Sequence, residues 1–138
     1  MKNVLKIVVA LMFMISYSCK AQQQLVETTA DVQKLNINEQ EFINKPLKKL
    51  LNEIKPKIKT AYGNIGYPCY FSFRFVDSDE IQRRGLENPS VGLYVYVREP
   101  LKWNFDDREK GKEYEWTKED VEKYGNLTVI RIKVIGNN

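Results

Sequence analysis

Three segments of the chain alternate between apolar and polar residues, and this alternation constrains the fold more than any other feature. Their apolar positions are Phe71, Phe73 and Phe75 in residues 69–76, Val91, Leu93, Val95 and Val97 in residues 91–98, and Ile130, Ile132 and Val134 in residues 127–135. Successive side chains of a strand point to opposite faces of a sheet. The pattern therefore predicts an antiparallel sheet with one face on a core and the other facing outward.

Residues 43–58 have the spacing of a helix that covers the apolar face of this sheet. Their apolar positions are Ile43, Leu47, Leu50, Leu51, Ile54 and Ile58. Asn44 can cap the start of the helix, and Pro56 should end or kink it near Ile54 because proline has no amide donor. The six lysines between Lys45 and Lys59 form either its solvated face or a basic surface that contacts a membrane or a polyanion.

The region between the second and third alternating segments contains signals for a hairpin and a short helix. Trp103 and Phe105 share one face of a first arm, Tyr114 and Trp116 share one face of a second, and a charged, glycine-containing turn joins them. This arrangement predicts a β-hairpin that pairs aromatic side chains across its strands. Residues 118–124 then form a short helix, with a capping box at Thr117 and Asp120 and with Gly125 at its end.

Two further segments complete the predicted fold. Residues 32–37 are expected to form a first strand, and residues 77–90 to hold one helical turn that Asp77 or Ser78 caps and Gly85 stops. We therefore predict an α+β fold for residues 32–138, with a three- or four-stranded antiparallel sheet and one main helix packed on one face. The β-hairpin and a short helix are inserted into this single domain.

The first residues have the composition of a secretory signal. Lys2 and Lys6 precede an apolar run over residues 7–15, and small or polar residues follow at 16–18. This order is typical of a signal peptide, here residues 1–18. The apolar run is shorter than the roughly 20 residues of a membrane span, so a signal anchor is the weaker interpretation. Cleavage after Ala21, which would release a soluble secreted protein, is a further alternative.

The run Ser16–Cys19, with the sequence SYSC, resembles the lipobox of bacterial lipoproteins. In that family the signal is cut just before a cysteine, which then receives a lipid. The resemblance implies that Cys19 is the lipid-attachment site and that residues 19–31 are a linker. It also implies export to the cell envelope, with the domain membrane-anchored and facing the periplasm or the cell surface.

Composition narrows the chemistry that the mature domain can perform. The chain has 22 basic and 18 acidic residues, and loss of Lys2 and Lys6 with the signal lowers its net charge from +4 to +2, so a nucleic-acid partner is not expected. The chain has no histidine that could activate a thiol, so we expect Cys69 to be buried and inert. No catalytic residue, metal ligand or cofactor site is assigned. The acids at 77–80 and 106–115 leave one enzymatic alternative, a small carboxylate-dependent hydrolase acting on envelope glycans.

The best candidate for function is therefore a surface. The predicted outward face of the sheet carries Arg74, Tyr94, Tyr96, Arg131 and Lys133, and the predicted hairpin adds Trp103. Tyrosine and tryptophan offer flat amphipathic contacts, and arginine stacks on rings or binds anions. These residues predict a noncatalytic envelope lipoprotein that binds a protein, peptide or glycan partner through the outward face or the aromatic hairpin.

Overall fold

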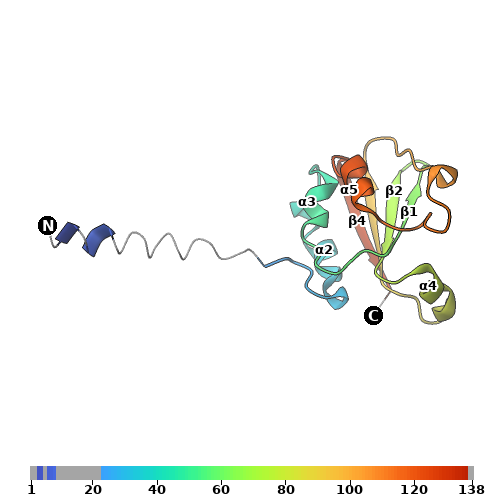
Figure 1. Cartoon of the computed structure of the whole chain (residues 1–138), viewed down its shortest axis with the longest axis horizontal. Helices are drawn as coiled ribbons and strands as arrows, with labels where there is room; N and C mark the ends of the chain where they lie inside the picture. The colour runs from blue at the N-terminus through green and yellow to red at the C-terminus, as the bar shows by residue number, and fades with distance from the viewer. Residues whose placement is uncertain (1–2, 5, 9–22, 137–138) are drawn as a thin grey trace.

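An antiparallel sheet of four strands, in the order β1-β2-β3-β4, forms one layer of the domain (Figure 1). The strands are β1 (Thr60–Asn64), β2 (Tyr70–Arg74), β3 (Gly92–Val97) and β4 (Val129–Ile135). This computed structural model describes residues 3–4, 6–8 and 23–136, so Cys19 and most of the predicted signal lie outside the described residues. The predicted α+β class is confirmed.

Short helices cover one face of the sheet. Figure 1 shows α2 (Gln33–Ile37), α3 (Leu47–Leu51) and α5 (Lys118–Tyr124) on the same side of the strands. The 3-10 turns η1 (Thr29–Asp31) and η2 (Glu39–Glu41) flank α2, and η3 (Phe105–Asp107) precedes α5. We call this side the helical layer. Within the described residues, no helix is both long and apolar enough to span a bilayer.

The predicted main helix is much shorter than its apolar spacing suggested. Only Leu47–Leu51 form α3, with extended Pro46 at the N-cap, while Asn44 has a left-handed φ of 63° and is not the cap. Of the predicted apolar residues, Leu47, Leu50, Ile54 and Ile58 are nevertheless buried, and Ile43 and Leu51 are partly buried against the same core. The segment thus fills the core as predicted, but as a short helix and turns.

The strand predicted for residues 32–37 is wrong, because this segment forms helix α2. Val32 and Leu35 are fully buried and three positions apart, which is helical spacing. The fourth strand of the sheet is instead β1, which the alternation did not reveal. Its inward positions are Ala61 and Gly63, which are too small to form an apolar pattern.

The inward faces of the other strands match the prediction, with one exception in β4. Phe71, Phe73, Leu93 and Val95 are all fully buried. In β4, however, Val97 pairs with Val129 while Tyr96 pairs with Arg131, so Ile130 is an extra residue in a β-bulge. Val129 is therefore buried, and Ile130, predicted to point inward, is exposed.

The hairpin predicted for residues 102–116 does not form strands. This segment contains only η3 and irregular backbone, and Trp103 and Trp116 pack edge-on against Phe71 on the inward face of the sheet. Its turn still brings Phe105 and Tyr114 together, with ring centroids 5.4 Å apart. The large rings gain more from covering the sheet than from pairing with each other, because burial of apolar area dominates their energetics.

The two predicted short helices are confirmed. Helix α4 (Ser78–Arg84) begins where the Asp77 carboxylate accepts a hydrogen bond from the Glu80 amide, and ends at Gly85, whose φ is 65°. Helix α5 begins with the predicted capping box, in which Thr117 and Asp120 satisfy each other's backbone amides. Gly125 follows its last residue. Both helix starts are specified by neighbouring residues, which is why local sequence predicts them.

The folded domain begins before the predicted linker ends. Val26 is fully buried and forms a parallel bridge with Ile54, and its amide donates to the Glu53 carbonyl at 2.9 Å. The Gln24 side chain donates to the Asn52 carbonyl, and the Leu25 amide to the Glu53 carboxylate. Residues 24–31 are thus part of the helical layer.

Substitution of Gly63 tests whether β1 and the loop that covers it are in close contact. A Cβ atom at Gly63 would lie 2.7 Å from Cβ and Cγ of Trp103. We expect Gly63→Ala to lower the free energy of unfolding by about 1–3 kcal/mol, because the ring or the strand must shift. Urea denaturation measures this change, with Gly66→Ala as the matched control, since its nearest atom lies 3.6 Å away. Equal stability of the two variants would contradict the proposed contact.

Candidate functional surface

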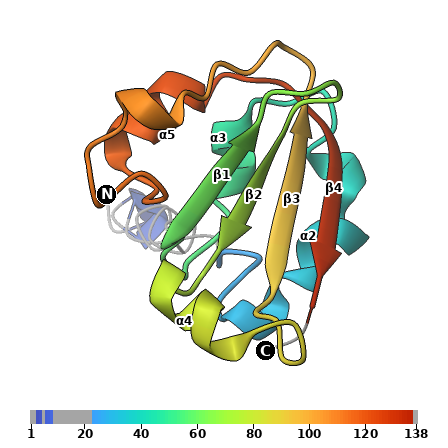
Figure 2. The same ribbon diagram turned by 90° about the vertical axis from the view of Figure 1, so that its right-hand side faces the viewer.

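The face of the sheet opposite the helical layer is open. Figure 2 looks onto the strands from that side, and no segment crosses them. In register, Asn64, Tyr70, Tyr96 and Arg131 form one row across the four strands, and Tyr62, Ser72, Tyr94 and Lys133 form the next. We call these residues, together with Arg74, the outer face. The structure therefore brings together five of the six candidate binding residues: Arg74, Tyr94, Tyr96, Arg131 and Lys133.

The tyrosines of the outer face pack against one another. The ring centroid of Tyr70 lies 5.9 Å from that of Tyr94 and 5.1 Å from that of Tyr96. Each ring is partly exposed. Tilted contacts at this separation are favourable for aromatic pairs, so the three rings form a braced apolar platform with polar hydroxyl tips.

Arg74 is held beside this platform, with its Cζ 5.7 Å from the centroid of the Tyr94 ring. Its guanidinium donates to the Ser90 carbonyl at 2.5 Å and to the Tyr94 hydroxyl at 2.8 Å. Gly92 makes this position accessible, because a Cβ atom there would lie 2.7 Å from Cζ of Arg74. Arg74 therefore contributes positive charge and organises Tyr94, but two of its donors are already used.

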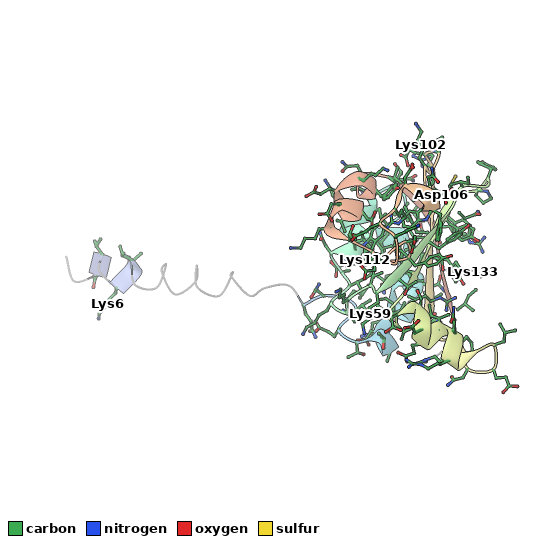
Figure 3. The ribbon with its side chains drawn as sticks, turned by 45° about the vertical axis from the view of Figure 1, so that its right-hand side comes forward. Lys6, Lys59, Lys102, Asp106, Lys112 and Lys133 are labelled. Atoms are coloured by element: carbon green, nitrogen blue, oxygen red, sulfur yellow. The ribbon has the colours of Figure 1, made fainter. Side chains whose placement is uncertain are left out.

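Arg131 and Lys133 are the freer cations of the outer face. Both are exposed, and Arg131 lies 5.5 Å from the centroid of the Tyr96 ring. Lys133 has neither an ion pair nor a side-chain hydrogen bond with any residue of the described chain, and Figure 3 shows it on the side away from α3 and α5. None of the four strands contains Asp or Glu. The outer face is thus positively charged, and no ion pair among the described residues involves Arg131 or Lys133, although the Glu39 carboxylate reaches β4 at the Ile132 amide.

An aromatic edge extends the outer face beyond β1. Tyr62, Tyr114 and Phe105 are 47, 41 and 42% exposed, respectively. The centroid of the Tyr114 ring lies 6.5 Å from that of Tyr62 and 5.4 Å from that of Phe105. The Ala61 amide donates to the Tyr114 carbonyl at 2.7 Å, which fixes this edge against β1. Exposed rings gathered in one patch are typical of binding surfaces.

Sequence reasoning missed Tyr62 and Tyr70 as members of this surface. Tyr70 alternates with Phe71, so the same period-2 pattern that identified Arg74 also places it outward. Tyr62 carried no comparable signal, because β1 itself was not predicted. Its position follows only from the pairing of Tyr62 with Ser72.

Trp103, the sixth candidate, does not belong to the outer face. It is 6% exposed, lies on the inward side against Phe71, and has the Arg108 guanidinium 3.9 Å above its ring. Its indole nitrogen has no hydrogen-bond partner within the described residues. Trp103 is instead one of the residues that line the cavity beside α5, because the hairpin that would have exposed it does not form.

Arg108 organises the loop around Trp103. It forms a bidentate pair with the Asp120 carboxylate at 2.9 and 2.8 Å, and also donates to the carbonyls of Glu113 and Glu115. Burial alone would raise the pKa of Asp120, but hydrogen bonds from Arg108 and Thr117 outweigh it and hold the pKa below its usual value. This ion pair therefore fastens residues 108–115 to the start of α5.

The acids of the loop surround a cavity of about 870 Å³ between residues 101–117 and α5. Its walls include Asp107, Glu109, Glu115, Glu119 and Asp120. A glycoside hydrolase needs one carboxyl group whose pKa is raised. Among these wall residues, the pKa of Asp120 is lowered instead. Outside the cavity, backbone hydrogen bonds likewise lower the pKa of Glu113. These shifts favour ionised structural groups over a general acid.

The acids at 77–80 belong to α4 and its start. Asp77 caps the helix, and Glu80 pairs with Arg84 at 2.8 Å. No group of three or more candidate metal ligands occurs among residues 3–4, 6–8 and 23–136. Cys69 is buried, as predicted.

Comparison of the chain with protein-family models, with curated protein sequences and with solved structures gives no match. The functional argument therefore depends on the outer face and its chemistry.

Acid titration tests the Arg108–Asp120 pair. We expect Asp120→Asn to lower the free energy of unfolding at pH 7 by about 3 kcal/mol, because it leaves a largely buried guanidinium without its counterion. The folded pKa of Asp120 lies below its unfolded value of about 3.9. The pair therefore stabilises fully above that pH, and its contribution is lost as the pH falls through the folded pKa.

The measurement is urea denaturation of both proteins between pH 7 and acid. The difference between wild type and Asp120→Asn should be constant near neutrality and shrink at acid pH. Exposed Asp106→Asn is the control and should differ little from wild type at any pH. A difference that persists unchanged into acid would contradict the role of the ionised carboxylate.

Proposed function

We propose that the chain is a noncatalytic lipoprotein of the cell envelope that binds a negatively charged partner, whether protein, peptide or glycan, through its outer face. The observation that carries this proposal is the open outer face itself. It combines partly exposed tyrosine rings with Arg131 and Lys133, and its four strands contain no carboxylate. A charged side chain without an internal counterion is available to an external one.

The shape of the surface supports an extended or flat partner. The cavity of about 870 Å³ lies beside α5, and none of the residues of the outer face lines it. The outer face is a pleated strand surface about 15 Å wide across four strands. Such a surface offers stacking contacts to several units of a chain at once, as tyrosines do in protein and sugar recognition.

Replacing the two free cations tests the proposed surface. We expect Arg131→Ser with Lys133→Ser to weaken binding of acidic probes at least about tenfold, because hydrogen bonds to charged groups contribute about 1.5–3 kcal/mol each. Poly-glutamate and polygalacturonate serve as the acidic peptide and the acidic glycan, and neutral dextran as the uncharged probe. Fluorescence anisotropy at two salt concentrations measures affinity, which should fall as salt rises.

Lys102→Ser with Lys110→Ser is the matched control, since it removes the same charge from exposed positions in the loop. The proposal also expects Tyr94→Ala with Tyr96→Ala to abolish capture while the domain stays folded. Equal loss in the Lys102 and Lys110 variant would show that net charge alone drives binding. Unchanged binding after loss of Arg131 and Lys133 would reject the outer face.

The lipid anchor has a separate test. Cells that express the full chain are labelled with radioactive palmitate and compared with cells that express Cys19→Ala. We expect the label in the wild type and its loss in the variant, because the acyl group is carried by the Cys19 residue. Absence of label from the wild type would reject the anchor while leaving the binding surface intact.

A further inference from the structure

The position at which the chain enters the domain constrains how an anchored domain faces its membrane. Backbone and side-chain hydrogen bonds fasten the chain from Gln24 onward, through Asn52, Glu53 and Val26. Val26 is fully buried. No free length therefore remains between Gln24 and the domain, and only the residues before Gln24 can act as a tether.

That tether is short relative to the domain. Five residue steps separate Cys19 from Gln24, and a fully extended chain covers at most about 18 Å in five steps. A domain of this length has a radius of gyration of about 13 Å and is about 35 Å across. A lipid on Cys19 thus holds Gln24 near the bilayer, and the tether cannot reach around to the opposite side of the domain.

Gln24 lies on the side opposite the outer face. Its partner Asn52 directly follows α3, and Figures 1 and 2 show α3 behind the sheet when the outer face is viewed from the front. The segment that enters at Gln23 also reaches the domain from the helical layer (Figure 1). The helical layer is therefore the side that the tether holds near the membrane, and we call it the tethered side. The outer face is on the opposite side of the sheet.

Charge on the tethered side suits a lipid surface. Lys45, Lys48 and Lys49 are exposed and have no ion pair with any described residue. The nearby acids Glu27 and Asp31 are neutralised by Lys55 and Lys34 at 3.2 and 3.0 Å. Glu53 accepts from the Leu25 amide and Glu39 from the Ile132 amide, whereas Glu41 makes no ion pair with any described residue, and neither do Glu119 and Glu122 of the neighbouring α5.

The geometry points to a fixed orientation: the helical layer around Gln24, with Lys45, Lys48 and Lys49, rests on the anionic bilayer surface, and the outer face is turned away from it. This inference rests on the proposed lipid anchor at Cys19. Lysines close to an anionic surface are attracted to it, so these three lysines favour the same orientation as the tether. The outer face then binds its partner on the side of the domain that is away from the membrane.

Fluorescence quenching by a nitroxide on lipid head groups tests the orientation. The full chain is expressed with either Asn52→Cys or Lys133→Cys, acylated protein is purified and verified by mass, and the new thiol is labelled after reconstitution into vesicles. Asn52 and Lys133 are both exposed, and buried Cys69 is protected from the label. We expect strong quenching at position 52 and little at position 133.

Vesicles with and without anionic lipid separate the tether from the lysines. Quenching at position 52 should be stronger with anionic lipid, and replacing Lys45, Lys48 and Lys49 by Ser should remove that difference. Equal quenching at positions 52 and 133 in acylated protein would overturn the orientation while the anchor stands. Absence of the acyl group from the purified protein would instead remove the anchor, and this inference with it.

Discussion

The inward face of the sheet must be covered, and among residues 23–136 no long helix is present to cover it. Instead α2, α3, α5 and the loop before α5 share the task, and a carboxylate fastens each part. Glu39 accepts from the Ile132 amide at 2.7 Å, Glu53 from the Leu25 amide, and Glu99 from the Thr128 amide. Asp120 holds the loop through Arg108. Charge-assisted hydrogen bonds of this kind are stronger than neutral ones, and they stabilise segments too short to be stable alone.

Because these carboxylates lie in the cover, the negative charges are separated from the positive charges on the strands. Burial opposes the ionised form of Glu99, yet hydrogen bonds from Thr128 keep its pKa below the usual value, as those from Arg108 and Thr117 do for Asp120. Four of the acids are thus used in the cover and at its edges: Glu39, Glu53, Glu99 and Asp120. The strands contain none, and their outward positions carry Arg74, Arg131 and Lys133. The positive outer face and the stability of the cover therefore have one common origin in where the acids are placed.

Local signals in the sequence predict much of this fold, whereas long-range packing decides the rest. The alternation in β2 and β3 and the caps of α4 and α5 depend on neighbouring residues, and all were predictable. Strand β1 was not, because Gly63 is small to admit Trp103, which comes from a loop distant in sequence. The hairpin failed for the same reason: Trp103 is drawn to Phe71 on the sheet, and tertiary burial overrides the local pairing.

Most residues of the outer face could be predicted from the sequence, because side chains along a strand alternate between the two faces of the sheet. The bulge at Ile130 tests this point, since an extra residue reverses the facing of everything before it in β4 and nothing after it. Val129 consequently turns inward, while Arg131 and Lys133 keep the outward side and stand beside Tyr96 and Tyr94. The bulge lets β4 bury both Val129 and Ile132 without moving either cation. The alternation within the strands therefore predicts the residues of the outer face correctly, even though the local patterns of the surrounding loops do not predict their structure.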